Sequence, residues 1–245
     1  MEDIRKAIEN AARLAGEKGL VKFTRFLDPA EVIQAQHIAK LHGACFCSWG
    51  GYEHAERVVG CFCPYGDTVT HEEYPLVCLH SRYSSKFCTI SHRDLLGAFM
   101  SLGLTRDSVG DMIIVESDIY VFAYAQTADY IAQSLTSAGR VHLDFSILSS
   151  IPQMPEPEGT HFVSVVSSLR LDAVLAAAYK LSRSDAADMI RSGLVKVNHQ
   201  ICERVDFLLT EDTLLSVRGK GRVRFVSIDG MTRKQRIGIT LFRYG

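Results

Sequence analysis

Apolar residues recur at helical spacing through residues 1–40, which predicts a helical N-terminal segment. The first apolar stripe consists of Ile4, Ala7, Ile8, Ala11 and Ala15. A second helix is expected to open where Asp28 precedes Pro29, because proline fits the first turn of a helix. Further on, the pattern changes to short apolar runs at 44–49 and 58–62, and these predict two strands.

Strand and helix patterns alternate between residues 76 and 147, in the order β-α-β-β-α-β. The expected strands cover 76–80, 87–90, 112–116, 119–123 and 141–145, and the expected helices cover 93–102 and 128–138, with a tight hairpin turn at Ser117-Asp118. This order is the ferredoxin-like plan, which many RNA-recognition modules share. Domains that bind metals or small ligands share it as well, so the topology alone assigns no activity.

Three prolines within residues 151–159 mark a stiff, extended connection. We therefore predict an α+β protein with a helical and β-containing N-terminal region over 1–75 and a ferredoxin-like (RRM-like) middle domain over 76–150. The linker then leads to a C-terminal domain over 160–245. With 47% hydrophobic residues in 245 positions, the chain has enough apolar material for several cores.

Two short helices and a strand are predicted after the linker. The apolar stripe of the first helix consists of Leu171, Val174, Leu175 and Ala178. Ser182 opens the second helix with an acidic residue three positions on, which is the spacing of a capping box. Arg183 and Arg191 lie eight residues apart, so they fall on roughly one side of that helix. Gly193 ends the helix in a left-handed turn, and the alternation at 195–198 predicts a strand.

The charge of the chain changes sign at the linker. Overall, 27 Lys and Arg against 28 Asp and Glu give a net charge of −1. Up to Gly159 the counts are 13 and 20, a net of −7, and from Thr160 onward they are 14 and 8, a net of +6. An acidic body with a basic module is typical of contact with nucleic acid.

A glycine-containing turn, Arg218-Gly219-Lys220-Gly221-Arg222, lies in the basic part of the chain. Its three cations stand on a flexible backbone that can approach phosphates closely. A solvated helix face and an ordinary basic turn would show the same residues, so a purely structural interpretation stays open.

The composition argues against several other classes of protein. No run approaches the ~18 consecutive apolar residues of a membrane-spanning helix, so no membrane contact is expected. The residues after Met1 lack the apolar core of a secretory signal, and the odd count of seven cysteines favours reduced thiols. Both features predict a cytoplasmic protein.

Three C-terminal segments, 168–175, 181–186 and 190–198, read SLRLDAVL, LSRSDA and IRSGLVKVN. They resemble the S4 RNA-binding domain, an αL-type module in which two short helices pack on a small sheet and grip structured RNA along its backbone. The resemblance implies an RNA face formed by Arg170, Arg183, Ser184, Arg191, Lys196 and Asn198, with Arg218, Lys220 and Arg222 as an added cationic edge. It also implies that the core includes Leu171, Leu175, Ile190, Val195 and Val197.

A second resemblance extends over nearly the whole chain. Its segments outside the S4-like domain are Phe26-Leu27-Asp28-Pro29, Gly50-Gly51-Tyr52, Ala55-Glu56-Arg57, Ser85-Lys86-Phe87, 92–97, 101–106 and Gly110-Asp111. They resemble the YlmH family of bacterial RNA-binding proteins. This resemblance implies a cytosolic protein that associates with the large ribosomal subunit, through ribosomal RNA, and with tRNA. It also implies a role in translation, in the rescue of stalled ribosomes (ribosome quality control), and a link to cell division.

The middle domain offers a second candidate contact with RNA. Its candidate cations are Lys86, Arg93 and Arg106. They flank a glycine-bearing turn, whose Gly110-Asp111 could instead simply lead into a strand. Three aromatic residues, Tyr120, Phe122 and Tyr124, alternate on one face of a strand, which fits either base stacking or a buried core. Readout of a specific base sequence therefore has no support in these residues.

Four cysteines form two Cys-x-Cys pairs, Cys45 with Cys47 and Cys61 with Cys63. In a strand each pair places both sulfurs on one side, so a hairpin could bring four thiolates together as zinc ligands. Structural zinc sites more often use turns with two to four residues between the cysteines, and cysteine is a common small core residue. We therefore expect buried thiols, no bound metal and no cofactor.

Catalytic motifs are incomplete in this sequence. Val141-His142-Leu143-Asp144 only partly matches the catalytic segment of pseudouridine synthases, and Arg170-Leu171-Asp172 belongs to the S4-like helix. No GxGxxG segment follows a strand, and no P-loop is present. We therefore expect a non-catalytic RNA-binding protein; the alternative is an RNA-modifying enzyme, pseudouridine-synthase-like, with an S4 appendage. In a third interpretation the acidic N-terminal half docks a protein partner and the S4-like domain only anchors it.

Overall fold

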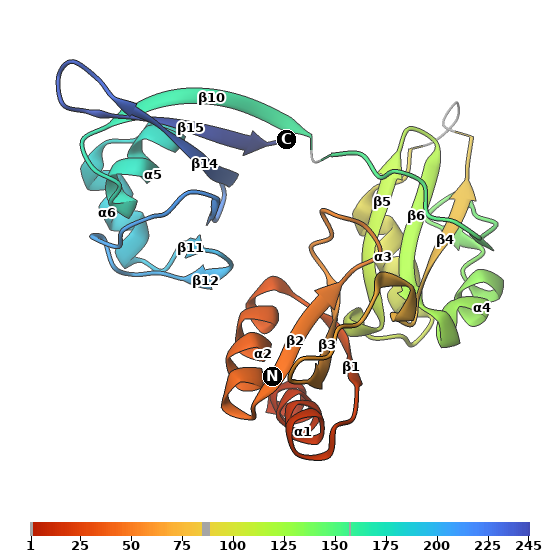
Figure 1. The fold of residues 1–245 in the computed structure, drawn as a ribbon. Coiled ribbons are helices and arrows are strands. Elements are labelled where there is room, and N and C mark those ends of the chain that lie inside the picture. The colour runs from red at the N-terminus through yellow and green to blue at the C-terminus, as the bar shows by residue number, and fades with distance from the viewer. Residues whose placement is uncertain (1, 85–88, 157) are drawn as a thin grey trace. The chain divides into compact units, whose positions relative to one another are not determined.

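A computed structural model describes residues 2–84, 89–156 and 158–245 of the chain (Figure 1). Its contacts divide the chain into two compact units, Met1–Pro155 and Glu156–Gly245. Both units combine helices with antiparallel sheets, which confirms the predicted α+β class. The boundary between the units falls inside the proline-containing segment, whereas the finer division at residue 75 stays a prediction. No helix within the described ranges is long and apolar enough to cross a membrane.

The N-terminal unit begins with a small antiparallel sheet and two helices. Its elements are α1 (Glu2–Lys18), β1 (Lys22–Leu27), α2 (Pro29–Leu41), β2 (Ala44–Trp49) and β3 (Val58–Pro64), and the strand order is β1-β3-β2. One buried cluster joins the helices to the sheet and includes Ile8, Ala12, Ala35, Ala39 and Phe62. The two helices therefore pack against one face of this sheet (Figure 1).

Strand β1 lies between the two helices predicted within residues 1–40, where the sequence pattern predicted no strand. Gly19 has a φ of +65° and ends α1, and Asp28 caps α2 as expected, so the residues between them adopt their own conformation. Phe23 and Phe26 favour a strand, and β1 pairs with β3. The sequence pattern missed this strand because six residues are too few to separate a helical from an alternating apolar spacing.

The remainder of the N-terminal unit follows the predicted β-α-β-β-α-β order. Its elements are a 3-10 turn η1 (His71–Glu73), β4 (Leu76–Arg82), α3 (His92–Ser101), a 3-10 turn η2 (Arg106–Ser108), β5 (Val109–Val115), β6 (Asp118–Tyr124), α4 (Ala125–Ser134), β7 (Ser137–Ala138), β8 (Val141–His142) and β9 (Ser146–Ile147). The main sheet of this region, which we call the middle sheet, has the order β5-β6-β4-β9, and all neighbouring strands in it are antiparallel. Helices α3 and α4 pack on one face of this sheet through Leu95, Phe99 and Ile131.

Several strand boundaries in this region differ from the prediction. Phe87 and Cys88 of the strand expected at 87–90 lie outside the described residues, and the two residues that follow them are not in a strand. The fourth strand of the sheet is β9 and not 141–145, because β8 pairs with β7 in a hairpin of its own. Both segments are short and apolar, so the sequence could not show which of them reaches the edge of the sheet.

The helix and the turn expected around β6 are also shifted. Helix α4 begins at Ala125 and ends at Ser134, because the next residues form β7. The hairpin turn between β5 and β6 consists of Glu116 and Ser117, one residue earlier than expected, and Glu116 has a φ of +53°. A glutamate is an uncommon residue in this left-handed region, so the sequence carried no signal for it.

The C-terminal unit is a six-stranded antiparallel sheet with two helices. Its elements are β10 (Gly159–Val166), α5 (Leu171–Tyr179), α6 (Arg183–Arg191), β11 (Val195–Val197), β12 (Gln200–Ile201), β13 (Thr213–Val217), β14 (Gly221–Met231) and β15 (Ile237–Tyr244). The strand order is β10-β15-β14-β13-β11-β12. The predicted core positions of the helices and of β11 are buried in one cluster, together with Val223, Phe225 and Leu241 of the sheet.

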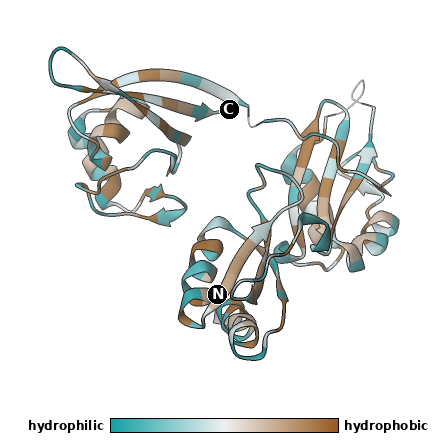
Figure 2. Cartoon of the chain, in the orientation of Figure 1, coloured by the Kyte–Doolittle hydropathy of each residue, from teal (hydrophilic) through white to brown (hydrophobic). Residues whose placement is uncertain are grey.

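The side chains of this sheet alternate between two faces. Val195, Val223 and Leu241 point toward the helices, and the residues next to them in the strands point to the opposite face, which we call the outer sheet face. The expected strand at 195–198 ends one residue early, because Asn198 enters a turn with a φ of +45°. The sequence also predicted no element after the turn at 218–222, where β14 and β15 form a long hairpin with a hydrophilic tip (Figure 2).

Candidate nucleic-acid interface

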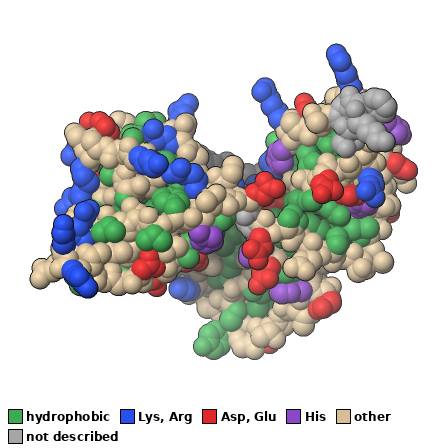
Figure 3. Space-filling view, turned by 90° about the horizontal axis from the view of Figure 1, so that it is seen from above, with side chains coloured by type: hydrophobic (Ala, Val, Ile, Leu, Met, Phe, Trp, Pro, Cys, Tyr) green, Lys and Arg blue, Asp and Glu red, His purple; other side chains and the backbone are tan. Residues whose placement is uncertain are grey.

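Helix α6 presents three of the residues expected on the RNA face. The hydroxyl of Ser182 accepts a hydrogen bond from the backbone N–H of Asp185 at 3.0 Å, which starts the helix as the sequence predicted. Arg183 and Ser184 then lie exposed in the first turn, and Arg191 lies exposed in the last. In Figure 3, Lys and Arg side chains gather on the visible face of the C-terminal unit, at the left of the view.

A buried carboxylate fixes two of the expected arginines. Asp172 is 5% exposed, and its oxygens accept hydrogen bonds from Arg170 Nε at 3.2 Å and from Arg183 Nη2 at 2.5 Å. The arginine side chains are still 42% and 46% exposed, so each guanidinium keeps one side toward solvent. Burial raises the pKa of Asp172, but the hydrogen bonds from Arg183 and Arg170 outweigh it and hold this pKa below its ordinary value. Asp172 thereby fixes the orientation of both cations within the folded unit.

Arg191 has a weaker partner than the two arginines around Asp172. Its Nη1 lies 3.2 Å from Asp188 Oδ1, and both side chains are well exposed. Exposed pairs of this kind contribute about 0–1 kcal/mol. A phosphate can therefore compete with Asp188 for this guanidinium at little cost.

Other expected RNA-face residues lie on a different side of the domain. Val195 and Val197 are buried against the helices, so Lys196 between them projects from the outer sheet face. Lys196 stands opposite Ser216 in β13, and Ser216 stands opposite Arg222 in β14. Arg222 therefore shares this face, with its guanidinium carbon 4.9 Å from the centre of the Tyr244 ring. The structure thus divides the expected set between the side of the domain formed by α5 and α6, which we call the helix side, and the outer sheet face.

The remaining expected residues of this unit have distinct positions. Arg218 and Lys220 are exposed in the turn between β13 and β14, where Gly219 has a φ of +79°. Asn198 uses its side-chain oxygen inside the fold, because Oδ1 accepts the backbone N–H of Leu214 at 2.8 Å. The turn therefore forms a cationic edge, whereas Asn198 holds the end of β11 in place.

One cationic element was missed in the sequence. The tip between β14 and β15 carries Arg233, Lys234 and Arg236, and all three are exposed. Arg236 donates a hydrogen bond to the carbonyl of Val165 at 3.0 Å, which ties this tip to β10. The run Arg-Lys-Gln-Arg was visible in the sequence, and a scan for dense positive charge could have found it.

The cations proposed for a second RNA contact do not form one group in the described structure. Arg93 is exposed in the first turn of α3, whereas Arg106 comes five residues after the other end of this helix, whose ten residues span about 15 Å. Arg106 donates to the carbonyls of Val109 and Gly110 at 2.9 and 3.0 Å, and burial lowers its pKa to about 10. Lys86 lies outside the described residues. The Arg106 guanidinium is therefore used in hydrogen bonds within the fold.

Two of the three alternating aromatic residues of β6, Phe122 and Tyr124, are used inside the fold. Phe122 is fully buried, and its ring lies 5.0 Å from that of Tyr52 in a stacked arrangement. Met154 from the proline-containing segment belongs to the same buried cluster. Tyr124 bonds through its hydroxyl to the carbonyl of Thr24. This face of the sheet is thus covered at Phe122, whereas Tyr120 is only partly buried and its ring centre lies 5.0 Å from that of His80.

The four cysteines of the N-terminal sheet lie on one face of the β2–β3 hairpin. Cys45 stands directly opposite Cys63, and Cys47 stands opposite Cys61. A hydrogen bond from Cys61 lowers the pKa of the Cys47 thiol to about 6, and the hydroxyl of Tyr74 donates to Cys47 Sγ at 3.3 Å. Among the described residues, no group of three or more His, Cys, Asp or Glu side chains is arranged to hold a metal ion.

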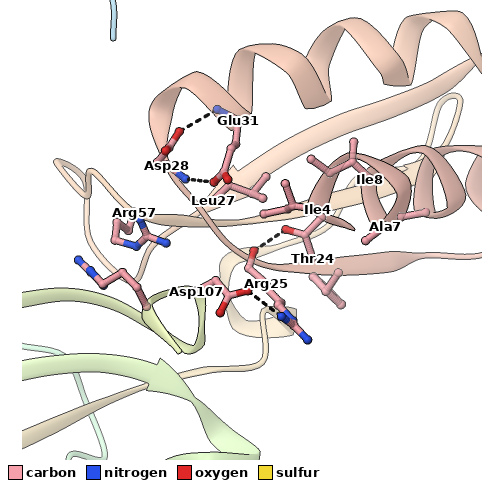
Figure 4. Close-up of a pocket in the computed structure, with 13 residues that line it drawn as sticks. Ile4, Ala7, Ile8, Thr24, Arg25, Leu27, Asp28, Glu31, Arg57 and Asp107 are labelled. Atoms are coloured by element: carbon pink, nitrogen blue, oxygen red, sulfur yellow. Dashed lines mark hydrogen bonds and ion pairs between the residues drawn. The ribbon is translucent and has the colours of Figure 1, made fainter. Parts of the chain in front are cut away.

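A cavity of about 600 Å³ lies beside α1 and β1 in the N-terminal unit. Ile4, Ala7 and Ile8 line one side, and the other side carries three arginines and three carboxylates: Arg25, Arg57, Arg106, Asp28, Glu31 and Asp107 (Figure 4). The Arg25 and Asp107 side chains pair at 2.7 Å, and Arg57 Nη2 donates to the carbonyl of Phe26 at 3.0 Å. The charges of this cavity are balanced, so it has no excess of cations for a phosphate.

Comparison with known proteins gives the family. Residues 70–150 match the family described as "Putative RNA-binding domain in YlmH", and residues 169–215 match the S4 domain. The chain is 35% identical over 233 residues to "Ribosome-associated protein quality control protein P2" of Bacillus subtilis (strain 168), covering 94% of this chain and 90% of that protein. The chain belongs to the YlmH family. A solved structure, "Cell division protein ylmH from Streptococcus pneumoniae", shares the fold over 60% of this chain and 90% of its own, with a TM-score of 0.52 and 19% identity.

Four of the YlmH-like segments, those at 26–29, 50–52, 55–57 and 110–111, meet in one structural joint. Asp111 accepts hydrogen bonds from the Tyr52 hydroxyl at 2.8 Å and from the backbone N–H groups of Glu56 and Arg57 at 2.7 and 3.2 Å. Burial raises the pKa of Asp111 despite these bonds. Arg57 continues the joint by donating to a carbonyl of β1. In this YlmH-family chain, the motifs at 50–57 and 110–111 thus fasten the small N-terminal sheet to the middle sheet.

Proposed function

We propose that this protein is a non-catalytic RNA-binding factor that associates with the ribosome in the cytoplasm and acts in ribosome-associated quality control. The observation that carries this proposal is the cationic side of the C-terminal unit, where Asp172 orients Arg170 and Arg183 beside α6. The name of the Bacillus subtilis relative and the two matching families support the same function.

We further propose that the partners are RNA of the large ribosomal subunit and tRNA. Arg170, Arg183 and Arg191 stand at helix ends with their side chains partly exposed, so their guanidinium groups can reach phosphates without reading base edges. Such contacts recognise the shape of folded RNA and not its base sequence. Large-subunit RNA and bound tRNA both offer structured backbones of this kind.

Sedimentation with large ribosomal subunits over a salt series tests the proposal. We expect Arg191→Glu to weaken binding at every salt concentration and to flatten the plot of log affinity against log salt by about 0.9 for the lost phosphate contact. Ser184→Glu, which places a negative charge on the residue next to Arg183, should add to the loss. Arg13→Glu is the matched control, because Arg13 is an exposed member of a helical ion pair in the N-terminal unit.

Two results would contradict the proposal. One is equal sedimentation of the wild-type protein and the Ser184→Glu, Arg191→Glu double variant. The other is an equal loss with the Arg13→Glu control, which would mean that only the net charge matters.

The alternative of an RNA-modifying enzyme has a separate test. Asp144, the residue expected to be catalytic in that case, is exposed, and its backbone N–H bonds to Ser81 Oγ at 3.0 Å. Mass analysis of ribosomal RNA and tRNA from a strain lacking the protein should show every modification intact. A lost modification that returns with the wild-type protein but not with Asp144→Ala would establish the enzyme and overturn our proposal.

The acidic N-terminal unit remains available for a protein partner under this proposal. Two of its three candidate RNA-contact cations are described, and Arg106 is used inside the fold. The wild-type protein bound to ribosomes can be crosslinked from its N-terminal unit and recovered. We expect these crosslinks to join proteins more often than RNA. Crosslinks mainly to RNA would instead restore the second RNA contact predicted for the middle domain.

A further inference from the structure

The outer sheet face of the C-terminal unit carries a group of aromatic and cationic side chains. His161 of β10 stands directly opposite Phe242 of β15, and Phe242 stands opposite Arg224 of β14. Tyr244 lies two residues beyond Phe242 and therefore on the same face. Arg222 lies beside Tyr244. Five side chains from three adjacent strands thus form one array, which we call the aromatic array.

The rings of the aromatic array contact one another without filling a core. The centres of the His161 and Phe242 rings are 4.8 Å apart, and those of Phe242 and Tyr244 are 5.0 Å apart at an interplanar angle of 84°. His161 is exposed, and the other two rings are partly exposed. A Cβ at Gly159 would lie 2.4 Å from Phe242 Cζ, so the glycine allows that ring to lie across β10.

Cations border these rings on the side toward β13. Arg224 Nε donates to the Tyr244 hydroxyl at 2.9 Å, and its Nη1 pairs with Asp212 at 2.7 Å. Arg222 stands over the Tyr244 ring, and the row continues through Ser216 to Lys196. Two residues that resemblance assigned to RNA contact, Lys196 and Arg222, therefore belong to this face and not to the helix side.

Exposed aromatic rings with neighbouring cations suit unpaired nucleotides. A base stacks on an aromatic ring through its flat face, which a duplex does not offer, and the cations neutralise the adjoining phosphates. The N-terminal unit covers its equivalent surface with Tyr52 and Met154, whereas no helix of the described C-terminal unit packs on the outer sheet face. The positive charge of this face favours RNA over a basic or purely apolar protein surface, and the partly exposed rings favour it over an acidic one, because they offer stacking to bases.

We propose that the aromatic array is a second RNA-binding surface, which stacks one or two unpaired bases while Arg222 and Lys196 neutralise the adjoining phosphates. The proposal rests on the proposed function in that the partner is RNA, but it concerns a separate surface and a different RNA structure. The helix side grips the backbone of folded RNA, and the outer sheet face takes a single strand or a flipped-out base beside it.

The test uses the full-length protein and a short unpaired RNA, about eight nucleotides long, within the usual size of single-strand sites. The RNA carries a fluorescent purine whose emission is quenched when it stacks on a ring. We expect quenching by the wild-type protein, and an affinity about tenfold lower for each stacked base lost in His161→Leu and Tyr244→Leu. Tyr65→Leu is the matched control, because Tyr65 is 87% exposed in the other unit.

Further variants separate this proposal from the proposed function. Arg191→Glu should lower sedimentation with ribosomes and leave the quenching of the short RNA nearly unchanged. His161 lies on an exposed edge strand, so His161→Leu should fold normally, which thermal unfolding can verify. Unchanged quenching and affinity in both His161→Leu and Tyr244→Leu would overturn the aromatic array. The proposal would also be overturned if duplex RNA competed as strongly as the unpaired RNA. It would equally be overturned if the face bound a protein and no RNA.

Discussion

At the scale of single residues, one buried carboxylate organises the cationic side of the C-terminal unit. Asp172 is the meeting point of Arg170 and Arg183, and its pKa lies below the ordinary 3.8. A carboxylate with a lowered pKa stabilises the fold above its ordinary pKa, and this stabilisation is lost as the pH falls through the lower folded value. The same residue therefore serves both the stability of the unit and the placement of the two cations that we propose to face RNA.

Reversing the charge of the two arginines of α6 should have unequal costs. In Arg183→Glu, the buried Asp172 meets a like charge, and we expect a loss of about 3 kcal/mol in the free energy of unfolding. Arg191→Glu removes only an exposed pair, and the expected loss is below about 1 kcal/mol. Native-state hydrogen exchange of the α5 amides measures both variants. Equal losses would show that Asp172 does not depend on Arg183.

A second residue-scale prediction concerns the thiol of Cys47. Its pKa of about 6 results from hydrogen bonds from Cys61 and Tyr74 that outweigh the effect of burial. The rate of alkylation of Cys47 should therefore reach half its maximum near pH 6, and Tyr74→Phe should move that midpoint upward. Peptide mass spectrometry after short exposure to iodoacetamide across pH gives the curve. A wild-type midpoint near the ordinary 9.0 would contradict the arrangement of the four cysteines.

At the scale of elements, the middle sheet and the C-terminal sheet differ in whether the face away from their helices is covered. The middle sheet is covered by the loop that contains Gly51 and Tyr52, so its aromatic Phe122 is core. The C-terminal sheet leaves His161 and Tyr244 in contact with solvent. Both sheets have the alternating pattern typical of a half-buried strand, and only the path of the flanking loops distinguishes them.

The covering loop should be sensitive to added volume. Gly51 has a φ of +99°, and a Cβ there would lie 2.4 Å from the buried Phe122 ring. We expect Gly51→Ala to lower the free energy of unfolding by about 2–4 kcal/mol, since backbone strain and overpacking add. Gly66→Ala is the control, because Gly66 has a similar φ of +93° and nothing within 4 Å.

Urea unfolding followed by the fluorescence of Trp49, the single tryptophan of the chain, measures both glycine variants. The control should lose only the backbone strain, about 1–2 kcal/mol. If both variants lost the same amount, the loop would not press on Phe122 as the structure shows.

At the scale of the whole molecule, the charge of the chain is divided between its two units. The net charge is −7 up to Gly159 and +6 beyond it, and the two values sum to the total of −1. The unit boundary at Pro155 lies close to this change of sign. Exposed charges act over about 10 Å at 0.1 M salt, so we expect the acidic charge carried on the same chain to weaken non-specific attraction of the basic unit for RNA at low salt.

Removal of the acidic unit should therefore change RNA binding in a salt-dependent way. We expect residues 156–245 to unfold cooperatively on their own, because their buried cluster belongs entirely to this unit. At low salt this fragment should bind unrelated RNA several-fold more tightly than the full chain, and the difference should vanish near 1 M salt, where the screening length is about 3 Å. Filter binding over a salt series measures this. An unchanged affinity at low salt would show that the units act without electrostatic interference.

Local signals in the sequence were sufficient for the features that local forces create. The cap at Ser182, the left-handed stop at Gly193 and the start of α2 at Asp28 depend on a few neighbouring residues, and the structure has all three. The β-α-β-β-α-β order and the α+β class followed from periodicity over longer windows. Strand β1 and the two-residue strand β9 were missed, because their identity depends on a partner strand far away in the sequence.

The sequence by itself determined the kinds of residues that we propose to contact RNA, arginines on a short helix and a basic turn, and it determined the change in the sign of the charge at the linker. Only the tertiary structure decided where those residues point. It buried Phe122, used Arg106 and Asn198 inside the fold, and sent Lys196 and Arg222 to the outer sheet face. The physical reason is that side-chain type and spacing are local properties, whereas burial and the choice of face depend on which distant strands and loops pack together.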